Sequence, residues 1–276
     1  MRIHKLASFS DGEQGGNPAG VVVEDHHPTE SEMQAIAAEV GYSETTFAAP
    51  QGEGYRVRYF TPEAEVAFCG HATIALGATL AQLRGDGTFA LQLNETAITV
   101  DGRCDDNGMW AALQSPATRS SSISDEAVAE ALKLLGYTQD DLAPELPPGL
   151  AHGGMNHLVL GLNSREALSA MEYDAETGRR LMTQHGWASI SLVFAESSQQ
   201  FHARNACAAV GIYEDPATGA ATAALAGYLR DIEWPHGGSI KIVQGEDMGM
   251  RSLITAEFSD EPGSSIRVSG AVRVIE

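Results

Sequence analysis

The sequence predicts an α+β protein of two similar lobes, and three observations lead to this fold class. Two segments roughly 150 residues apart, about the length of one domain, match each other without gaps: Glu65–Leu80 and Glu214–Leu229. Strand-like stretches outnumber helical ones and come in runs, without the strict alternation of a doubly wound parallel sheet. Neither GxGxxG nor GxxxxGKS/T occurs, so no phosphate-binding glycine loop is indicated.

Each copy of the repeat predicts the beginning of an apolar helix, opened by Gly70 in one lobe and by Gly219 in the other. The first turn of a helix leaves backbone N–H groups without intrahelical partners and carries a partial positive charge, so it is a ready anion site. We expect both helix openings to face one cleft, where they would bind a carboxylate or a developing oxyanion.

In the first lobe, a capping box of Thr29 and Glu32 predicts a helix that ends at Gly41. A second helix is predicted over 70–84, because the glycine-rich run that starts at Gly85 stops it. Runs of β-forming residues bounded by turn residues predict the strands of this lobe, over 3–9, 19–23, 42–47, 55–60, 89–93, 97–100 and 109–113.

In the second lobe, Ser124 and Gly136 are the cap residues of an amphipathic helix predicted over 125–135. Two more helices are predicted over 175–185 and 219–230. The strands expected in the second half of the chain cover 157–162, 189–195, 201–204, 239–243, 253–258 and 265–275. The serine-rich stretch 115–124 is the expected boundary between the lobes.

The composition restricts the partners. The chain of 276 residues has a formal net charge of -20 and a sequence pI near 4.7, which argues against nucleic acid and anionic membrane surfaces as partners. Three cysteines without CxxC spacing give no disulfide framework and no zinc signature. Neither a signal peptide nor a membrane-spanning run is recognised, so we expect a cytoplasmic protein.

Three residues of the first lobe could carry acid–base chemistry. Glu44 lies where a helix gives way to a strand, and partial desolvation there would suit a general acid or base, although a surface glutamate is the alternative. Cys69 stands at a helix N-cap, where the helix field favours a thiolate, unless it is only a small buried hydrophobe. His71 could carry a proton or simply hydrogen-bond a neighbouring carbonyl.

The second lobe offers Asp215, just before the helix opening at Thr218. Asp215 could orient His71 or a substrate amine, or it could cap the helix that follows. The repeat aligns Thr218 with Cys69, so a two-base site would carry a hydroxyl, a poor base, on one side.

Arginines on predicted strands are the candidate cationic groups near the cleft. Arg56 and Arg58 alternate with β-forming residues and should share one face of a strand, and Arg204 lies on a strand of the second lobe. A solvated strand face is the alternative interpretation.

Several short motifs follow one another over nearly the whole chain: Gly16–Val21, Tyr42–Phe47, Arg58–Pro62 with Glu65–Val66, Cys69–Thr73, Gly211–Ile212 with Glu214–Gly219, and Gln244–Gly245. Any one of these strings is a weak signal. Together and in this order they closely resemble the phenazine biosynthesis PhzF-like family.

The resemblance implies a diaminopimelate-epimerase-like fold, in which each of two pseudo-symmetric lobes is a curved mixed sheet around a central helix. In such folds the last strand returns to the first lobe. We therefore expect a first lobe of 1–115 with 265–276, and a second lobe of 116–264. The relatives of this fold also suggest a homodimer.

The family's characterised activity is the isomerisation of a dihydro-hydroxyanthranilate, in which a glutamate moves a proton on the ring system. The resemblance implies Glu44 as that glutamate, with His71 and Asp215 as further catalytic residues. It implies a small anionic metabolite as substrate, and neither a metal nor an organic cofactor. The implied substrate-binding residues are Cys69, Gly70, Thr218, Gly219 and Ala220.

The chain departs from the family pattern at two positions of the second helix opening. Ala220 stands where serine is common, and Thr222 replaces a frequent histidine. The leading hypothesis is a cofactor-independent isomerase that moves a proton on a small carboxylate-bearing substrate through Glu44. The alternatives are a two-base racemase or epimerase that uses Cys69, against which Thr218 argues, and a non-catalytic ligand-binding member of the fold.

Overall fold

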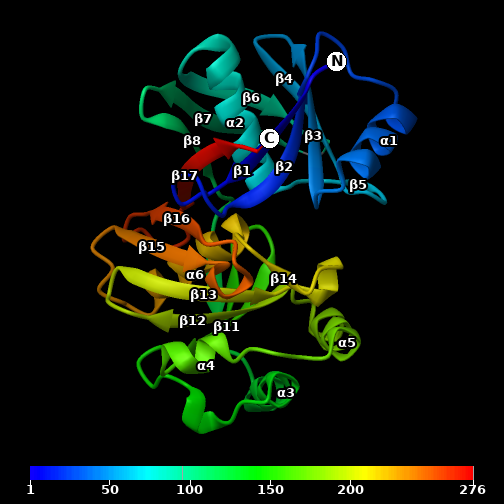
Figure 1. The fold of residues 1–276 in the computed structure, drawn as a ribbon. Coiled ribbons are helices and arrows are strands. Elements are labelled where there is room, and N and C mark those ends of the chain that lie inside the picture. Colours follow the sequence, from blue (N-terminus) through cyan, green and yellow to red (C-terminus); the bar gives the residue numbers. More distant parts are fainter. Residues whose placement is uncertain (95, 276) are drawn as a thin grey trace. The chain divides into compact units, whose positions relative to one another are not determined.

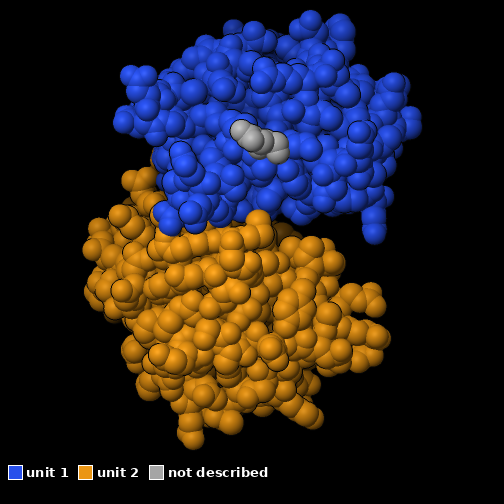
Figure 2. All heavy atoms as spheres, in the orientation of Figure 1, with its two compact units in different colours: residues 1–114, 269–276 blue, residues 115–268 orange. Residues whose placement is uncertain are grey.

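The computed structural model describes residues 1–94 and 96–275, and the chain divides into two compact units (Figure 2). Unit 1 comprises Met1–Gln114 and Ser269–Glu276, and unit 2 comprises Ser115–Val268. From the sequence we expect the chain to leave the first lobe after residue 115 and to return to it at residue 265. Among the described residues, none of the helices is both long and apolar enough to cross a bilayer.

Unit 1 consists of a mixed sheet and two helices. Its elements are β1 (Ile3–Ser8), β2 (Asn17–Val23), α1 (Glu30–Val40), β3 (Glu44–Gln51), β4 (Gly54–Phe60), β5 (Glu65–Val66), α2 (Gly70–Arg84), β6 (Gly87–Gln92), β7 (Ala97–Asp105), β8 (Gly108–Gln114) and most of β17 (Arg267–Val274).

The strands of unit 1 pair in a closed ring. The order is β1-β2-β3-β4-β6-β7-β8-β17, and β17 pairs again with β1. The pairs β2–β3 and β4–β6 are parallel. The pairs β1–β2, β3–β4, β6–β7, β7–β8 and β1–β17 are antiparallel. Closure leaves no free sheet edge within the ring, which removes a site for unwanted strand pairing.

Helix α2 is the central helix of unit 1 (Figure 1). Every residue from His71 to Ala81 is buried, as expected for a helix that is apolar on all faces. Its backbone comes very close to β7: a Cβ built on Gly102 would lie 2.1 Å from the Gly77 carbonyl oxygen, so only glycine fits at position 102. Helix α1 covers the opposite face of the sheet, where Met33 and Ala37 pack on Phe47 and Phe60.

Unit 2 repeats this plan with more connecting structure. Its elements are β9 (Arg119–Ser121), α3 (Asp125–Leu135), η1 (Gln139–Asp141), β10 (Gly149–His152), β11 (Asn156–Leu162), α4 (Arg165–Ser169), α5 (Ala175–His185), β12 (Ser189–Ala195), β13 (Gln200–Ala206), η2 (Ala208–Val210), β14 (Glu214–Asp215), α6 (Gly219–Asp231), β15 (Ser239–Gln244), η3 (Glu246–Met248) and β16 (Ser252–Glu257).

The order and direction of the strands in unit 2 match those in unit 1. An antiparallel pair, β10–β11, is followed by a parallel pair, β11–β12, an antiparallel pair, β12–β13, and a second parallel pair, β13–β15. The central helix is α6, buried from Ala221 to Arg230. The predicted fold class, two pseudo-symmetric lobes of curved mixed sheet around a central helix, is confirmed.

Cap residues in the sequence predicted where the helices α1 and α3 begin and end. The capping box of Thr29 and Glu32 and the left-handed Gly41 bound α1, and Ser124 and Gly136 bound α3, as predicted. The sequence missed β9, β10, α4 and the two-residue strands β5 and β14. These elements are five residues or shorter, so they lack a periodic pattern, and β10 directly follows Pro147 and Pro148.

Candidate active site

Glu44 is the first residue of β3, and its side chain points toward α2. Its Oε2 atom lies 3.4 Å from Nε2 of His71, and its side chain is 20% exposed. This carboxylate oxygen is buried and has no hydrogen-bond partner among the described residues, because the contact with His71 lacks hydrogen-bond geometry. A carboxylate oxygen without a donor has free lone pairs that can accept a hydrogen bond.

Cys69 and His71 stand at the opening of α2. Cys69 is the N-cap residue, as predicted, and its Sγ lies 3.3 Å from Nδ1 of His71. The hydroxyl of Ser43 lies 3.4 Å from Nε2 of the same ring. Cys69 and His71 are 7% and 6% exposed. The structure therefore brings the predicted residues Glu44, Cys69 and His71 into one cluster within unit 1.

Hydrogen bonds from neighbouring side chains hold the backbone of this opening. The Thr73 hydroxyl donates to the Cys69 carbonyl at 2.7 Å, and Tyr59 Oη lies 2.7 Å from the same hydroxyl. The Ser8 hydroxyl donates to the His71 carbonyl at 2.6 Å. The backbone on both sides of the helix-opening glycine is thus held, by Thr73 of α2 itself at Cys69 and by Ser8 of β1 at His71, which pre-organises their side chains.

The second helix opening holds Asp215 and Thr218. The Thr218 hydroxyl donates to Oδ2 of Asp215 at 2.6 Å, and Oε1 of Gln244 accepts from the Thr218 backbone N–H at 3.1 Å. The Gln244 amide nitrogen donates to the Asp215 carbonyl at 2.6 Å. Gln244 is 1% exposed, and the motif Gln244–Gly245 did not predict these contacts. Its partner in that motif, Gly245, has a φ of 72°, and a Cβ there would lie 2.7 Å from the Pro216 carbonyl oxygen.

The two central helices differ from the others at their N-termini. In the described chain, α1, α3, α4 and α5 each have an N-cap side chain that accepts a backbone hydrogen bond: Thr29, Ser124, Ser164 and Asp174. The N-cap side chains of α2 and α6, Cys69 and Thr218, make no such bond. The first backbone N–H groups of the two central helices therefore lack the side-chain acceptor that the other four helices possess.

Strand register aligns the two units residue by residue. Thr45 pairs with Phe60, which pairs with Glu65, and in unit 2 Ile190 pairs with Ala206, which pairs with Glu214. The residue before Thr45 is Glu44 and the residue before Ile190 is Ser189, so Ser189 is the counterpart of Glu44. The same alignment matches Cys69 with Thr218 and His71 with Ala220. Only unit 1 carries the acid–base set.

The arginines predicted as candidate cationic groups have hydrogen-bond partners within their own units. Arg58 donates from Nε and Nη2 to the carboxylate of Glu65, at 2.8 and 2.5 Å. Arg204 donates from the same two atoms to Glu214, at 2.9 and 2.6 Å. The bond from Arg58 lowers the pKa of Glu65 despite partial burial. Arg56 donates to the backbone carbonyl of Gln92. Arg58 and Arg204 are therefore neutralised within their own units.

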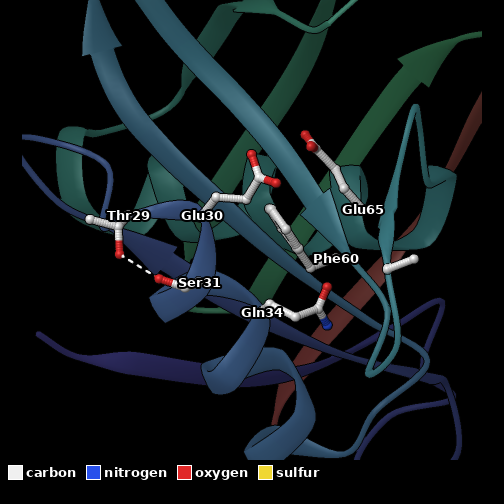
Figure 3. Close-up of a pocket in the computed structure, with 7 residues that line it drawn as sticks. Thr29, Glu30, Ser31, Gln34, Phe60 and Glu65 are labelled. Carbon is white, nitrogen blue, oxygen red and sulfur yellow. Dashed lines mark hydrogen bonds between the residues drawn. The ribbon is translucent and has the colours of Figure 1, made fainter.

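A hollow of about 690 Å³ lies on the other face of the unit 1 sheet, beside the start of α1 (Figure 3). Phe60 at its wall belongs to the cluster under α1, whereas the preceding residue, Tyr59, hydrogen-bonds to α2, because successive strand residues face opposite sides. This hollow is thus separate from the Glu44 cluster. Its lining residues are Thr29, Glu30, Ser31, Gln34, Phe60, Ala64 and Glu65.

Comparison with known proteins gives one consistent result. The family model described as phenazine biosynthesis-like protein, PhzC-PhzF, matches residues 6–276. Trans-2,3-dihydro-3-hydroxyanthranilate isomerase of Pseudomonas aeruginosa is 31% identical over 281 residues, which cover 96% of this chain and 94% of that protein. A protein named uncharacterized isomerase YddE, from Escherichia coli K12, is 27% identical over 99% of this chain and 96% of its own length.

The fold comparison agrees with the sequence comparison. A crystal structure of a phenazine biosynthesis protein of the PhzF family from Bacillus anthracis matches with a TM-score of 0.88 and 21% identity. The match covers 100% of this chain and 98% of that one. The resemblance stated from the motifs is confirmed.

Proposed function

The chain belongs to the phenazine biosynthesis-like protein family, and on that premise we propose that it is a cofactor-independent isomerase that moves a proton on a small carboxylate-bearing substrate. A cyclic, dihydroanthranilate-like compound is the first candidate, because a relative 31% identical to this chain is named for a dihydro-hydroxyanthranilate. Membership in a family whose curated relatives are named isomerases supports the enzyme class.

The observation that carries the proposal is the acceptor oxygen of Glu44 beside His71. Glu44 Oε2 is buried, finds no hydrogen-bond partner in the described part of the chain and lies 3.4 Å from His71 Nε2. In our mechanism Glu44 removes a proton from a substrate carbon and returns it to another position of the conjugated system. His71, in contact with both Glu44 and Cys69, donates to the charge that develops or stores the proton. Positioned acid–base groups of this kind contribute ~100- to 10,000-fold in rate.

Helix openings supply the electrostatic part of the mechanism. Removing the proton leaves enolate-like negative charge on the substrate, and backbone N–H groups at an uncapped helix N-terminus stabilise such charge. The absence of capping side chains at α2 and α6 supports this use. We assign substrate binding to Cys69, Gly70, Thr218, Gly219 and Ala220. We propose Asp215, at the α6 opening, as a further catalytic residue.

One observation favours the racemase alternative, and another opposes it. The Cys69 sulfur lies 3.3 Å from a ring nitrogen of His71, which would stabilise a reactive thiolate. Its counterpart in unit 2, however, is Thr218, whose hydroxyl donates to Asp215, so a second thiol base is lacking at that position. Inactivation by iodoacetamide, with protection by substrate, would support the use of Cys69 as a base.

The test is solvent deuterium exchange into a panel of cyclic and amino-acid carboxylates, followed by NMR. We expect exchange with at least one dihydroanthranilate-like acid, and a ~100- to 10,000-fold slower rate for Glu44→Gln, because the amide cannot accept the proton. Ser189→Ala, at the counterpart position in unit 2, is the control and should retain most of the rate. Full exchange by folded Glu44→Gln would remove this residue from the mechanism.

A further inference from the structure

We propose that the Glu44, Cys69 and His71 side chains form a binding site for Zn²⁺, and that bound zinc blocks proton transfer at this cluster. The first statement stands on the geometry of unit 1 alone. The second rests on the proposed function, because it requires Glu44 to be the proton acceptor.

The distances between the donor atoms suit a small tetrahedral ion. One donor atom from each residue can be chosen so that all three lie within 4.8 Å of one another. His71 Nε2 is 3.9 Å from Cys69 Sγ and 3.4 Å from Glu44 Oε2. Zinc bond lengths and tetrahedral angles place neighbouring ligand atoms about 3.3–3.6 Å apart. A few tenths of an ångström of movement in the His71 and Cys69 side chains, together with rotation of Glu44, would complete the site.

The donor types select the metal. A thiolate, an imidazole and a carboxylate together suit zinc, whereas magnesium and calcium prefer oxygen ligands only. Three protein ligands leave a fourth coordination position for water, as in zinc sites that are open to solvent on one side. The partial exposure of Glu44 (20%) leaves one side of the cluster open to solvent.

Two further observations distinguish this cluster from three ligand-type residues that merely lie close together. Buried Glu44 Oε2 has no hydrogen-bond partner among residues 1–94 and 96–275, so an ion there would meet an unsatisfied acceptor. The backbone carbonyls of Cys69 and His71 each accept a hydroxyl hydrogen bond, from Thr73 and from Ser8. This support fixes the two ligands before any ion arrives, which lowers the entropy cost of binding.

Zinc binding and proton transfer exclude each other on simple chemical grounds. Coordination uses the lone pair of Glu44 that would otherwise accept the substrate proton, and it requires the Cys69 thiol to release its own proton to solvent. No electron is transferred, and removal of the ion by a chelator restores the original side chains. The inference is therefore a reversible zinc block of the site.

The experiment uses Co²⁺ as a spectroscopic probe on the full-length protein, under anaerobic and reducing conditions. We expect one equivalent of Co²⁺ to give a thiolate-to-cobalt charge-transfer band with tetrahedral d–d bands, both displaced by one equivalent of Zn²⁺. Cys69→Ala and His71→Ala should weaken Co²⁺ binding at least ~10-fold. Cys104→Ser, which alters a partly exposed thiol on β7, is the matched control and should leave the spectrum unchanged.

The outcomes separate the two proposals. Absence of the thiolate band, or its retention in folded Cys69→Ala, overturns the metal site and leaves the Glu44→Gln exchange result intact. If wild type gives the thiolate band but no substrate exchanges deuterium, the metal site is supported and the isomerase proposal is contradicted. Where exchange is found, one equivalent of Zn²⁺ should abolish it and a chelator should restore it; exchange at full rate in the zinc-loaded protein overturns the proposed block.

Discussion

The two central helices begin beside different side chains, although the strands around them pair in the same order. At α2 the aligned positions hold Glu44, Cys69 and His71, and at α6 they hold Ser189, Thr218 and Ala220. The first set consists of residue types that serve as general acids and bases, and the second set does not. The comparison teaches that the repeat supplies a common scaffold whose two helix openings carry different side chains.

The two units share an arginine–glutamate ion pair next to the opening of each central helix. Arg58 with Glu65, and Arg204 with Glu214, make the same pair of hydrogen bonds from the same guanidinium atoms. Each pair joins the strand before the central helix to the two-residue strand that leads into it, β4 to β5 and β13 to β14. The glycine that opens each helix is also common to both. Identical support with different chemistry makes each unit the control for the other.

The largest effect should come from removing the shared ion pair, and it should differ between the units. Arg204 and Glu214 are 9% and 3% exposed, whereas Arg58 and Glu65 are 20% and 24% exposed. Arg204→Met leaves Glu214 buried and unpaired, at a cost of about 3–5 kcal/mol in the free energy of unfolding. Arg58→Met should cost about 1–2 kcal/mol, because water reaches Glu65. Calorimetry of both variants checks this, and equal losses would contradict a role for burial.

A smaller effect is expected from acid, and it should arise in unit 2. His157 pairs with Ser189 in β12, while its unit 1 counterpart is Ala19. Burial lowers the pKa of His157 from 6.5 to about 4. The unfolded chain then binds the proton more readily, so the free energy of unfolding is full above pH 6.5 and falls by up to roughly 3 kcal/mol toward pH 4.

The measurement is the free energy of unfolding from urea titrations between pH 7 and pH 4. His157→Gln should be less stable at pH 7 but should lose less stability on acidification than wild type does. His26→Gln, at an exposed position of unit 1, serves as the control. A wild-type slope retained in His157→Gln would show that other groups dominate acid unfolding.

The smallest effect separates two aligned threonines. Thr73 donates to the Cys69 carbonyl and contacts Tyr59, whereas the buried hydroxyl of Thr222 has no hydrogen-bond partner among the residues that the structure describes. Thr73→Val should cost about 1–3 kcal/mol in the free energy of unfolding, while Thr222→Val should change it by less than about 1 kcal/mol, in the stabilising direction. Urea denaturation of both variants compares them, and a larger loss at Thr222 would contradict the hydrogen-bond assignment.

Local chemistry explains what the sequence predicted well. Thr29, Ser124, Gly41 and Gly136 bound their helices because caps and left-handed C-terminal glycines act within a few residues. The repeated helix openings were recognisable because their apolar runs and glycines stand at the same spacing. The residues Glu44, Cys69 and His71 could be picked out from motifs, since Cys69 and His71 are separated in the chain only by Gly70.

Contacts between distant segments explain what the sequence did not provide. The support of His71 by Ser8 joins residues 63 positions apart, and the bond between Gln244 and Asp215 joins residues 29 positions apart. Both contacts depend on strand pairing, which no short pattern records. The partners of Arg58 and Arg204 were missed for the same reason, because the strands β5 and β14 that carry Glu65 and Glu214 are only two residues long.

The return of β17 determines when unit 1 can finish folding during synthesis. Its residues 272–274 pair with β1 near the start of the chain, so the ring cannot close until the ribosome has translated all of unit 2. Until then β1 and β8 expose unpaired edges, which other nascent chains could join. Unit 2, whose residues are contiguous, has no such delay. A fragment ending before residue 269 should therefore aggregate, and the unit that carries Glu44, Cys69 and His71 should finish folding last.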